Sequence, residues 1–127
     1  MLSIRKELKQ GLTDVTGMDV YFVQPPINTD VAIPLLILEE KSNNQYYRDR
    51  NSRMEIVSLS YDISIYSNDP SELFDLMRSI DDYCFNLGLK RTYTSADMNI
   101  DNHLWCKTMT YVCKATLLKD GTIQISN

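Results

Sequence analysis

The sequence contains few of the residues from which catalytic and metal sites are built. It has one histidine, three cysteines, four glycines and four prolines among 127 residues. A metal site needs several clustered ligands, and a phosphate-binding loop needs closely spaced glycines, whereas these glycines are scattered along the chain. The cysteines form no CxxC pair, so we expect three free thiols. The sequence therefore gives no positive evidence for an enzyme, and we expect no catalytic residue, no metal and no cofactor.

Two groups of polar residues come nearest to a chemical site. His103 follows Asp97 and Asp101, which permits a weak cation site, but a loop histidine at the start of a strand explains the same residues. Asp81 and Asp82 are adjacent on a predicted helix, where neighbouring side chains diverge by about 100°. We interpret this pair as part of a solvent-facing surface.

Long hydrophobic runs are also missing. The longest, from Val31 to Leu38, is interrupted by Pro34 and is too short to span a bilayer, so we expect no contact with a membrane. With 43% hydrophobic and 24% charged residues, the chain has an ordinary globular composition, and we assign residues 1–127 to a single domain. A net charge of −4 argues against a dedicated nucleic-acid binder but leaves room for a local basic patch.

The clearest pattern lies between Met54 and Gly88. Apolar and polar residues alternate from Ile56 to Ser67, which predicts a half-buried strand. An N-D-P-S-E turn follows, in which Asp69 suits the N-cap and Pro70 the first position of a helix. Apolar residues then recur at helical spacing as far as Gly88, which we expect to end the helix.

Weaker patterns flank this unit on both sides. They predict an amphipathic helix over Leu2–Leu12, a turn at Ile27–Ala32 and a loop at Thr94–Asn102. The fold class is therefore α+β, with an antiparallel-dominated sheet, an N-terminal helix and one central helix packed on one face, and a long projecting β-hairpin. The remaining predicted strands are Val20–Val23 (ended by Gln24-Pro25-Pro26), Ile33–Glu39, Leu89–Tyr93, Leu104–Leu118 and Thr122–Ile125.

The segment Lys41–Arg53 is the best candidate for a binding surface. It is polar throughout, shows no periodicity, and carries four cations against one anion in an acidic chain. We expect a loop here that forms the tip of the extended hairpin. Tyrosine and arginine dominate protein interfaces and also stack on nucleobases, so the tip suits a protein partner, a nucleic acid or solvent alone. The candidate partner-binding residues are Lys41, Tyr46, Tyr47, Arg48, Arg50 and Arg53.

The order of these features resembles the tail terminator, or tail completion, proteins of long-tailed bacteriophages. The resemblance extends over about Leu2 to Leu118. It rests on the amphipathic N-terminal helix, the V-Y-F-V-Q-P-P strand, the Y-D-I-S-I-Y-S strand, the N-D-P-S-E-L turn, the L-G-L exit, and the late strand L-W-C-K-T-M-T-Y-V-C-K-A. None of these segments is a specific signature by itself.

The resemblance implies a structural virion protein at the head–tail interface, assembled in the host cytoplasm. Its protomers would form a hexameric ring that caps the tail tube, ends polymerisation of the tube protein and provides the surface on which the head docks. The implied partners are further copies of the chain, the tail tube protein and a head-completion or neck protein, with passing contact to DNA in the lumen. The family supplies no catalytic residue and no small-molecule substrate. A head-completion protein, or a soluble nucleic-acid-binding module acting through the basic hairpin, remains the alternative.

Overall fold

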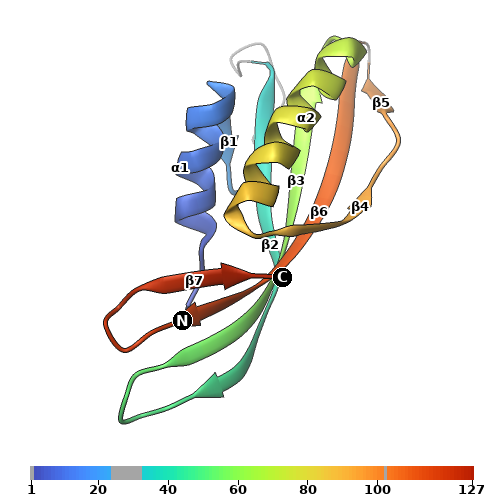
Figure 1. Cartoon of the computed structure of the whole chain (residues 1–127). Helices are drawn as coiled ribbons and strands as arrows, with labels where there is room; N and C mark the ends of the chain where they lie inside the picture. The colour runs from blue at the N-terminus through green and yellow to red at the C-terminus, as the bar shows by residue number, and fades with distance from the viewer. Residues whose placement is uncertain (1, 24–32, 102) are drawn as a thin grey trace.

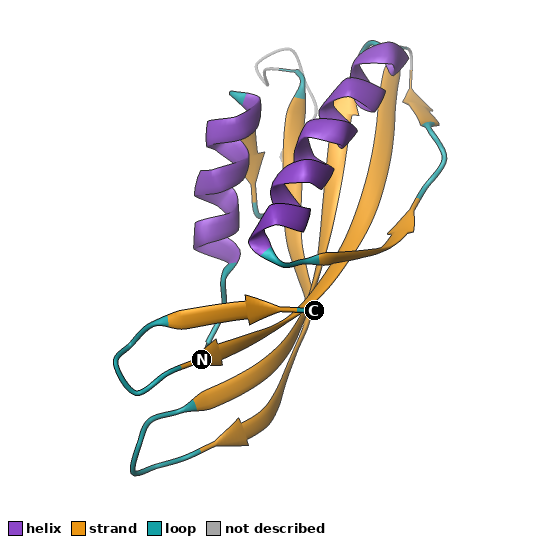
Figure 2. Ribbon diagram, in the orientation of Figure 1, coloured by secondary structure: helices purple, strands orange, loops and turns teal. Residues whose placement is uncertain are grey.

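The computed structural model describes residues 2–23, 33–101 and 103–127, so the predicted turn at Ile27–Ala32 and the prolines before it lie outside the described residues. The described chain has an α+β fold in which two helices pack on a mostly antiparallel, seven-stranded sheet (Figure 1). This confirms the predicted fold class. Both helices lie on one face of the sheet, and no described helix covers the other face (Figure 2). No helix in this part of the chain is long and apolar enough to cross a membrane.

The sheet is built around two long neighbouring strands, β3 and β6. The strand order is β1-β2-β3-β6-β4, and the short strands β5 and β7 also pair with β6. Strand β1 runs parallel to the start of β2, and every other pairing is antiparallel. The strands are β1 (Asp19–Tyr21), β2 (Leu35–Arg48), β3 (Glu55–Ser67), β4 (Lys90–Thr94), β5 (Met98–Asp101), β6 (Leu104–Leu117) and β7 (Ile123–Ser126).

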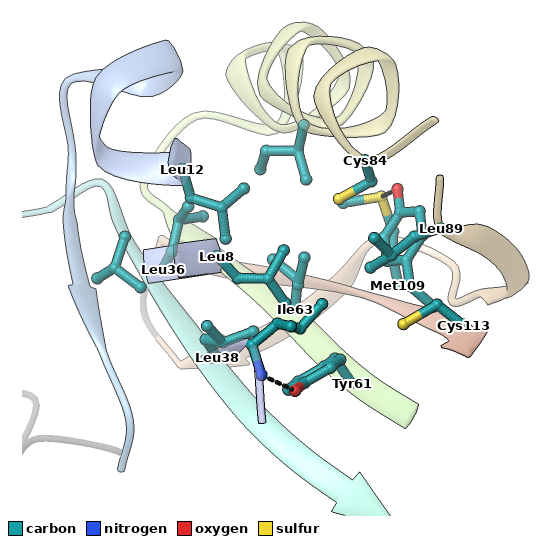
Figure 3. Close-up of a cluster of buried hydrophobic side chains, with 14 of the residues drawn as sticks. Leu8, Leu12, Leu36, Leu38, Tyr61, Ile63, Cys84, Leu89, Met109 and Cys113 are labelled. Atoms are coloured by element: carbon teal, nitrogen blue, oxygen red, sulfur yellow. Dashed lines mark hydrogen bonds between the residues drawn. The ribbon is translucent and has the colours of Figure 1, made fainter. Parts of the chain in front are cut away.

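Strand β3 confirms the predicted alternation. Its odd-numbered residues are buried on the face of the sheet that carries the helices, and its even-numbered residues from Ile56 to Tyr66 are partly exposed on the opposite face. Strand β6 supplies the matching apolar side chains, because Tyr61 lies opposite Tyr111 and Ile63 lies opposite Met109. Figure 3 shows Tyr61, Ile63 and Met109 together with residues of both helices in one core.

Helix α2 (Pro70–Leu87) begins and ends where the sequence predicts. The Asp69 side chain accepts a hydrogen bond from the Ser71 amide at 3.0 Å, and Pro70 occupies the first turn. Gly88 ends the helix with φ of 107°, a conformation that favours glycine. The helix places fully buried Leu73, Ile80 and Cys84 on the sheet.

Helix α1 (Arg5–Thr16) starts and ends later than the predicted Leu2–Leu12. Gly11 lies in the interior of this helix, and Tyr83 of α2 packs directly over the position where its side chain would be. The helix ends instead at Gly17, whose φ of 70° and hydrogen bond to the Thr13 carbonyl form the cap. The missing side chain at Gly11 therefore allows the two helices to approach closely.

Replacing Gly11 by alanine should destabilise the fold. Alanine usually stabilises a helix interior by up to about 1 kcal/mol relative to glycine. Here the added methyl group collides with the Tyr83 ring, so we expect a loss of about 1–3 kcal/mol in thermal or urea unfolding. In a Tyr83→Leu background the same change should be neutral or stabilising. A Gly11→Ala chain more stable than the wild type would contradict this account of the helix contact.

One predicted loop contains a strand. We predicted Thr94–Asn102 as a loop, but Met98–Asp101 form β5, which pairs with the start of β6. Every residue of β5 is exposed and its register is interrupted between Asn99 and Asp101, so the sequence carries no alternation that would mark it. The other predicted strands, except Ile33–Glu39, agree with the structure to within two residues at each end.

The three cysteines are free, as expected, and all are buried. Burial raises the pKa of Cys84 to about 12 and that of Cys113 to about 11, because the thiolate loses its hydration in the core. These thiols are therefore inert packing groups at neutral pH.

Candidate interaction surface at the tip of the long hairpin

Two hairpins extend the sheet beyond the helices, with the β2–β3 hairpin beside the β6–β7 hairpin (Figure 1). They are joined because β3 and β6 stay paired to the end, where Glu55 lies opposite Leu117. The tip of the long hairpin is thus held by a four-stranded extension of the sheet.

The polar segment that we predicted as a loop is mostly strand, so that part of the prediction is wrong. Residues Lys41–Arg48 belong to β2, and Arg48 lies opposite Glu55. The register shifts at Lys41 and at Tyr46, where one residue of β2 bulges out of the pairing. These bulges break the period of two, and for that reason the sequence shows no strand pattern.

Asp49 orders the turn that remains. Its carboxylate accepts hydrogen bonds from the Asn51 amide at 2.9 Å and the Ser52 hydroxyl at 2.8 Å. These two bonds lower the pKa of Asp49, with the Ser52 bond the larger cause. Its carbonyl also accepts from the Arg53 amide at 2.9 Å, and Arg53 adopts a left-handed φ of 59°. The tip therefore has a defined conformation that sets the directions of its arginines.

Three of the predicted binding residues meet in one groove. Arg48, Arg50 and Arg53 line a cavity of about 860 Å³. The rest of its lining is Ser3, the carboxylates of Asp49 and Glu55, and the apolar side chains Leu2 and Leu117. Arg48 Nε lies 4.0 Å from the Glu55 carboxylate. Within the described residues, neither of the other two arginines forms an ion pair.

The other three predicted residues lie elsewhere on the hairpin. Lys41 Nζ lies 3.5 Å from the Glu39 carboxylate, nearer the body of the molecule. Tyr46 stacks under Lys114, whose Nζ lies 5.3 Å from the ring centre, on the sheet face away from the helices. Tyr47 is exposed on the same face, opposite Ile56. The residues that the sequence predicts to form one binding surface therefore lie on two different faces of the hairpin.

A polar network that the sequence did not reveal fixes residues 2–4 across the inner face of the hairpin. Buried Glu55 accepts from the Leu2 amide at 3.1 Å. Glu40 accepts from the Ser3 and Tyr61 hydroxyls, each at 2.7 Å. Glu55 was the one residue from which the sequence could have indicated this network. It falls at a buried position in the alternation of β3, and a buried carboxylate needs a hydrogen-bond or charge partner. This network builds one wall of the groove.

The described residues contain no group of three or more histidine, cysteine or acidic side chains placed to hold a metal ion. Asp81 is not simply solvated, as we had interpreted it, because it accepts a hydrogen bond from buried Tyr111 at 2.8 Å and lies 3.5 Å from Arg91. Asp82 is exposed, as expected, and so is His103 at the start of β6. The groove at the tip places three guanidinium groups beside two carboxylates and the apolar side chains of Leu2 and Leu117, and this excess of donors suits an anionic group.

Comparison of the chain with models of known protein families and with curated protein sequences found no match.

Removing Arg48 should leave the fold intact. Its side chain is 69% exposed and its ion pair with Glu55 is at the 4.0 Å limit, so Arg48→Ala should change the free energy of unfolding by no more than about 0.5 kcal/mol in urea titration. A variant that unfolds would show that the tip is part of the core and not a surface for partners.

Proposed function

We propose that this chain is a structural protein of a phage tail, whose copies form a ring that closes the tail tube, ends polymerisation of the tube protein and provides the docking surface for the head. The order of sequence features described above suggests the family. The observation that carries the proposal is the four-stranded extension of the sheet beyond the helices (Figure 2). It holds a basic tip away from an otherwise acidic body.

The distribution of charge supports this proposal. Residues Lys41–Arg53 carry three net positive charges, which leaves seven net negative charges on the rest of a chain whose total is −4. A molecule with opposite charges on distinct surfaces is suited to ordered contact with copies of itself and with partners.

Native mass spectrometry and negative-stain electron microscopy would test the proposal. We expect the pure chain, or the chain mixed with its tail tube protein, to form closed rings, and we propose six copies per ring. Rings should bind the end of tube assemblies and stop their growth. A chain that stays monomeric at high concentration in both conditions would refute the proposal. Rings that bind a head portal complex but not the tube would favour the head-completion alternative.

The convergence of Arg48, Arg50 and Arg53 favours one second candidate, a nucleic-acid-binding module. Binding to DNA through these residues should weaken steeply as salt rises, because each phosphate contact releases counterions. Salt-dependent binding by a monomer, abolished when the three arginines are replaced together, would support this candidate over the ring.

A further inference from the structure

We infer that the ring is held together by the arginine groove of one copy, lined by Arg48, Arg50 and Arg53, receiving the outer face of helix α2 of the next copy. The inference rests on the proposed ring and adds the two surfaces that would meet in it. They lie in different parts of the molecule, the groove at the tip of the extension and α2 on the body (Figure 1).

The outer face of α2 has the apolar groups that such a contact needs. Phe74 is 55% exposed and Phe85 is 75% exposed, although both are large aromatic side chains. They are eleven residues apart, so they lie on one side of the helix about 16 Å from each other. Aromatic side chains are enriched in interface hot spots, and two on one solvent-facing stripe indicate a surface for a partner.

The charge on α2 is opposite to that at the hairpin tip. The helix carries four acidic residues and a single arginine, so its formal charge is −3. Asp75 and Asp82 are exposed beside the two phenylalanines, and Arg78 is exposed between them. None of these three charged residues forms an ion pair within the described residues. Arginine binds carboxylates strongly and also stacks on aromatic rings, so the groove provides a partner for both kinds of group on this helix.

Side-chain docking is favoured over pairing of strand edges. Beyond its short pairing with β1, the outer edge of β2 has no strand beside it among the described residues, and such edges invite pairing with another copy. However, β2 bulges at Lys41 and Tyr46 and is largely polar there. Bulges and charged side chains are features that block edge-to-edge pairing.

The two surfaces also explain why the contact would give a ring and not a simple dimer. A groove that binds a different patch on the next copy is a head-to-tail contact, so each copy offers one free groove and one free helix. Such contacts build a closed ring when the rotation between successive copies closes, and an open filament when it does not. A patch that bound its own equivalent would stop at two copies.

Two complementary variants test this inference. The groove variant is Arg50→Glu with Arg53→Glu, and the helix variant is Asp82→Lys with Phe85→Ser. All four residues are exposed, and thermal unfolding would verify that each variant folds. We expect each variant alone to be monomeric in native mass spectrometry under the conditions in which the wild type forms rings. Mixed in equal amounts, they should form a one-to-one dimer and no ring, because only one intact groove and one intact helix can meet.

Matched charge reversals on α1 provide the control. Lys6→Glu and Glu7→Lys each reverse one charge, in the same directions as the groove and helix variants, on another exposed surface and should leave ring formation unchanged. Rings formed by either interface variant, or a mixture that stays monomeric, would overturn the inference while the proposed function stands. Rings lost in the α1 controls would overturn it as well. A wild-type chain that never assembles would overturn both proposals.

Discussion

Replacing Ile80 by alanine is expected to lower the free energy of unfolding by about 2–5 kcal/mol. The Ile80 side chain is fully buried in the core between α2 and the sheet, where β3 and β6 supply its neighbours. The long paired strands β3 and β6 hold the sheet side of this core in place, so the cavity left by the lost methylene and methyl groups cannot close easily. Chemical denaturation followed by circular dichroism would measure the loss.

The same helix offers a matched control on its outer face. Phe74→Ala removes a larger side chain, but one that is 55% exposed, and should change stability by less than about 0.5 kcal/mol. Leu76 is only partly buried, so its replacement by alanine should cost less than that of Ile80. Equal losses at Ile80 and Phe74 would mean that α2 does not bury the face assigned to it.

The parts of the fold that sequence reasoning predicted well are those in which one local pattern decides the structure. Strand β3 alternates without interruption, and α2 has a carboxylate cap, a proline in its first turn and a glycine at its end. Each signal agrees with its neighbours along the chain, so no distant contact was needed to interpret it. Helix α1 was misplaced because the reason for Gly11 lies in another element, the Tyr83 ring.

Residues Lys41–Arg48 of β2 were predicted as a loop because they are polar even on the face that residues 2–4 cover, and contacts with those distant residues explain that polarity. Asn43 donates to the Leu2 carbonyl at 2.8 Å, and Gln45 donates to the Glu55 carboxylate at 3.3 Å. A strand that forms hydrogen bonds with a segment crossing over it needs polar side chains at positions where a half-buried strand ordinarily has apolar ones. The sequence around Lys41 gives no sign that residues 2–4 cross the hairpin there.

The composition of the candidate site was predictable, but its geometry was not. The sequence identifies an excess of tyrosine and arginine between Lys41 and Arg53. Which of these side chains meet depends on the bulge at Tyr46 and on the left-handed conformation of Arg53. A single inserted residue shifts every later side chain to the opposite face of a strand. For this reason the arginines share a groove and the tyrosines face away from it.

Replacing Tyr61 by phenylalanine should destabilise the protein by about 1–3 kcal/mol, although it removes a single oxygen atom. The buried hydroxyl donates to Glu40 at 2.7 Å and accepts from the Ile4 amide at 3.2 Å. The dashed line at Tyr61 in Figure 3 marks the bond from the amide. Without it, the buried amide loses its partner and residues 2–4 lose one of their attachments to the hairpin. Hydrogen exchange should show faster exchange at the Ile4 amide, whereas Tyr47→Phe on the exposed face should change neither exchange nor stability. If Tyr61→Phe proves as stable as the wild type, the network does not hold the groove wall in place.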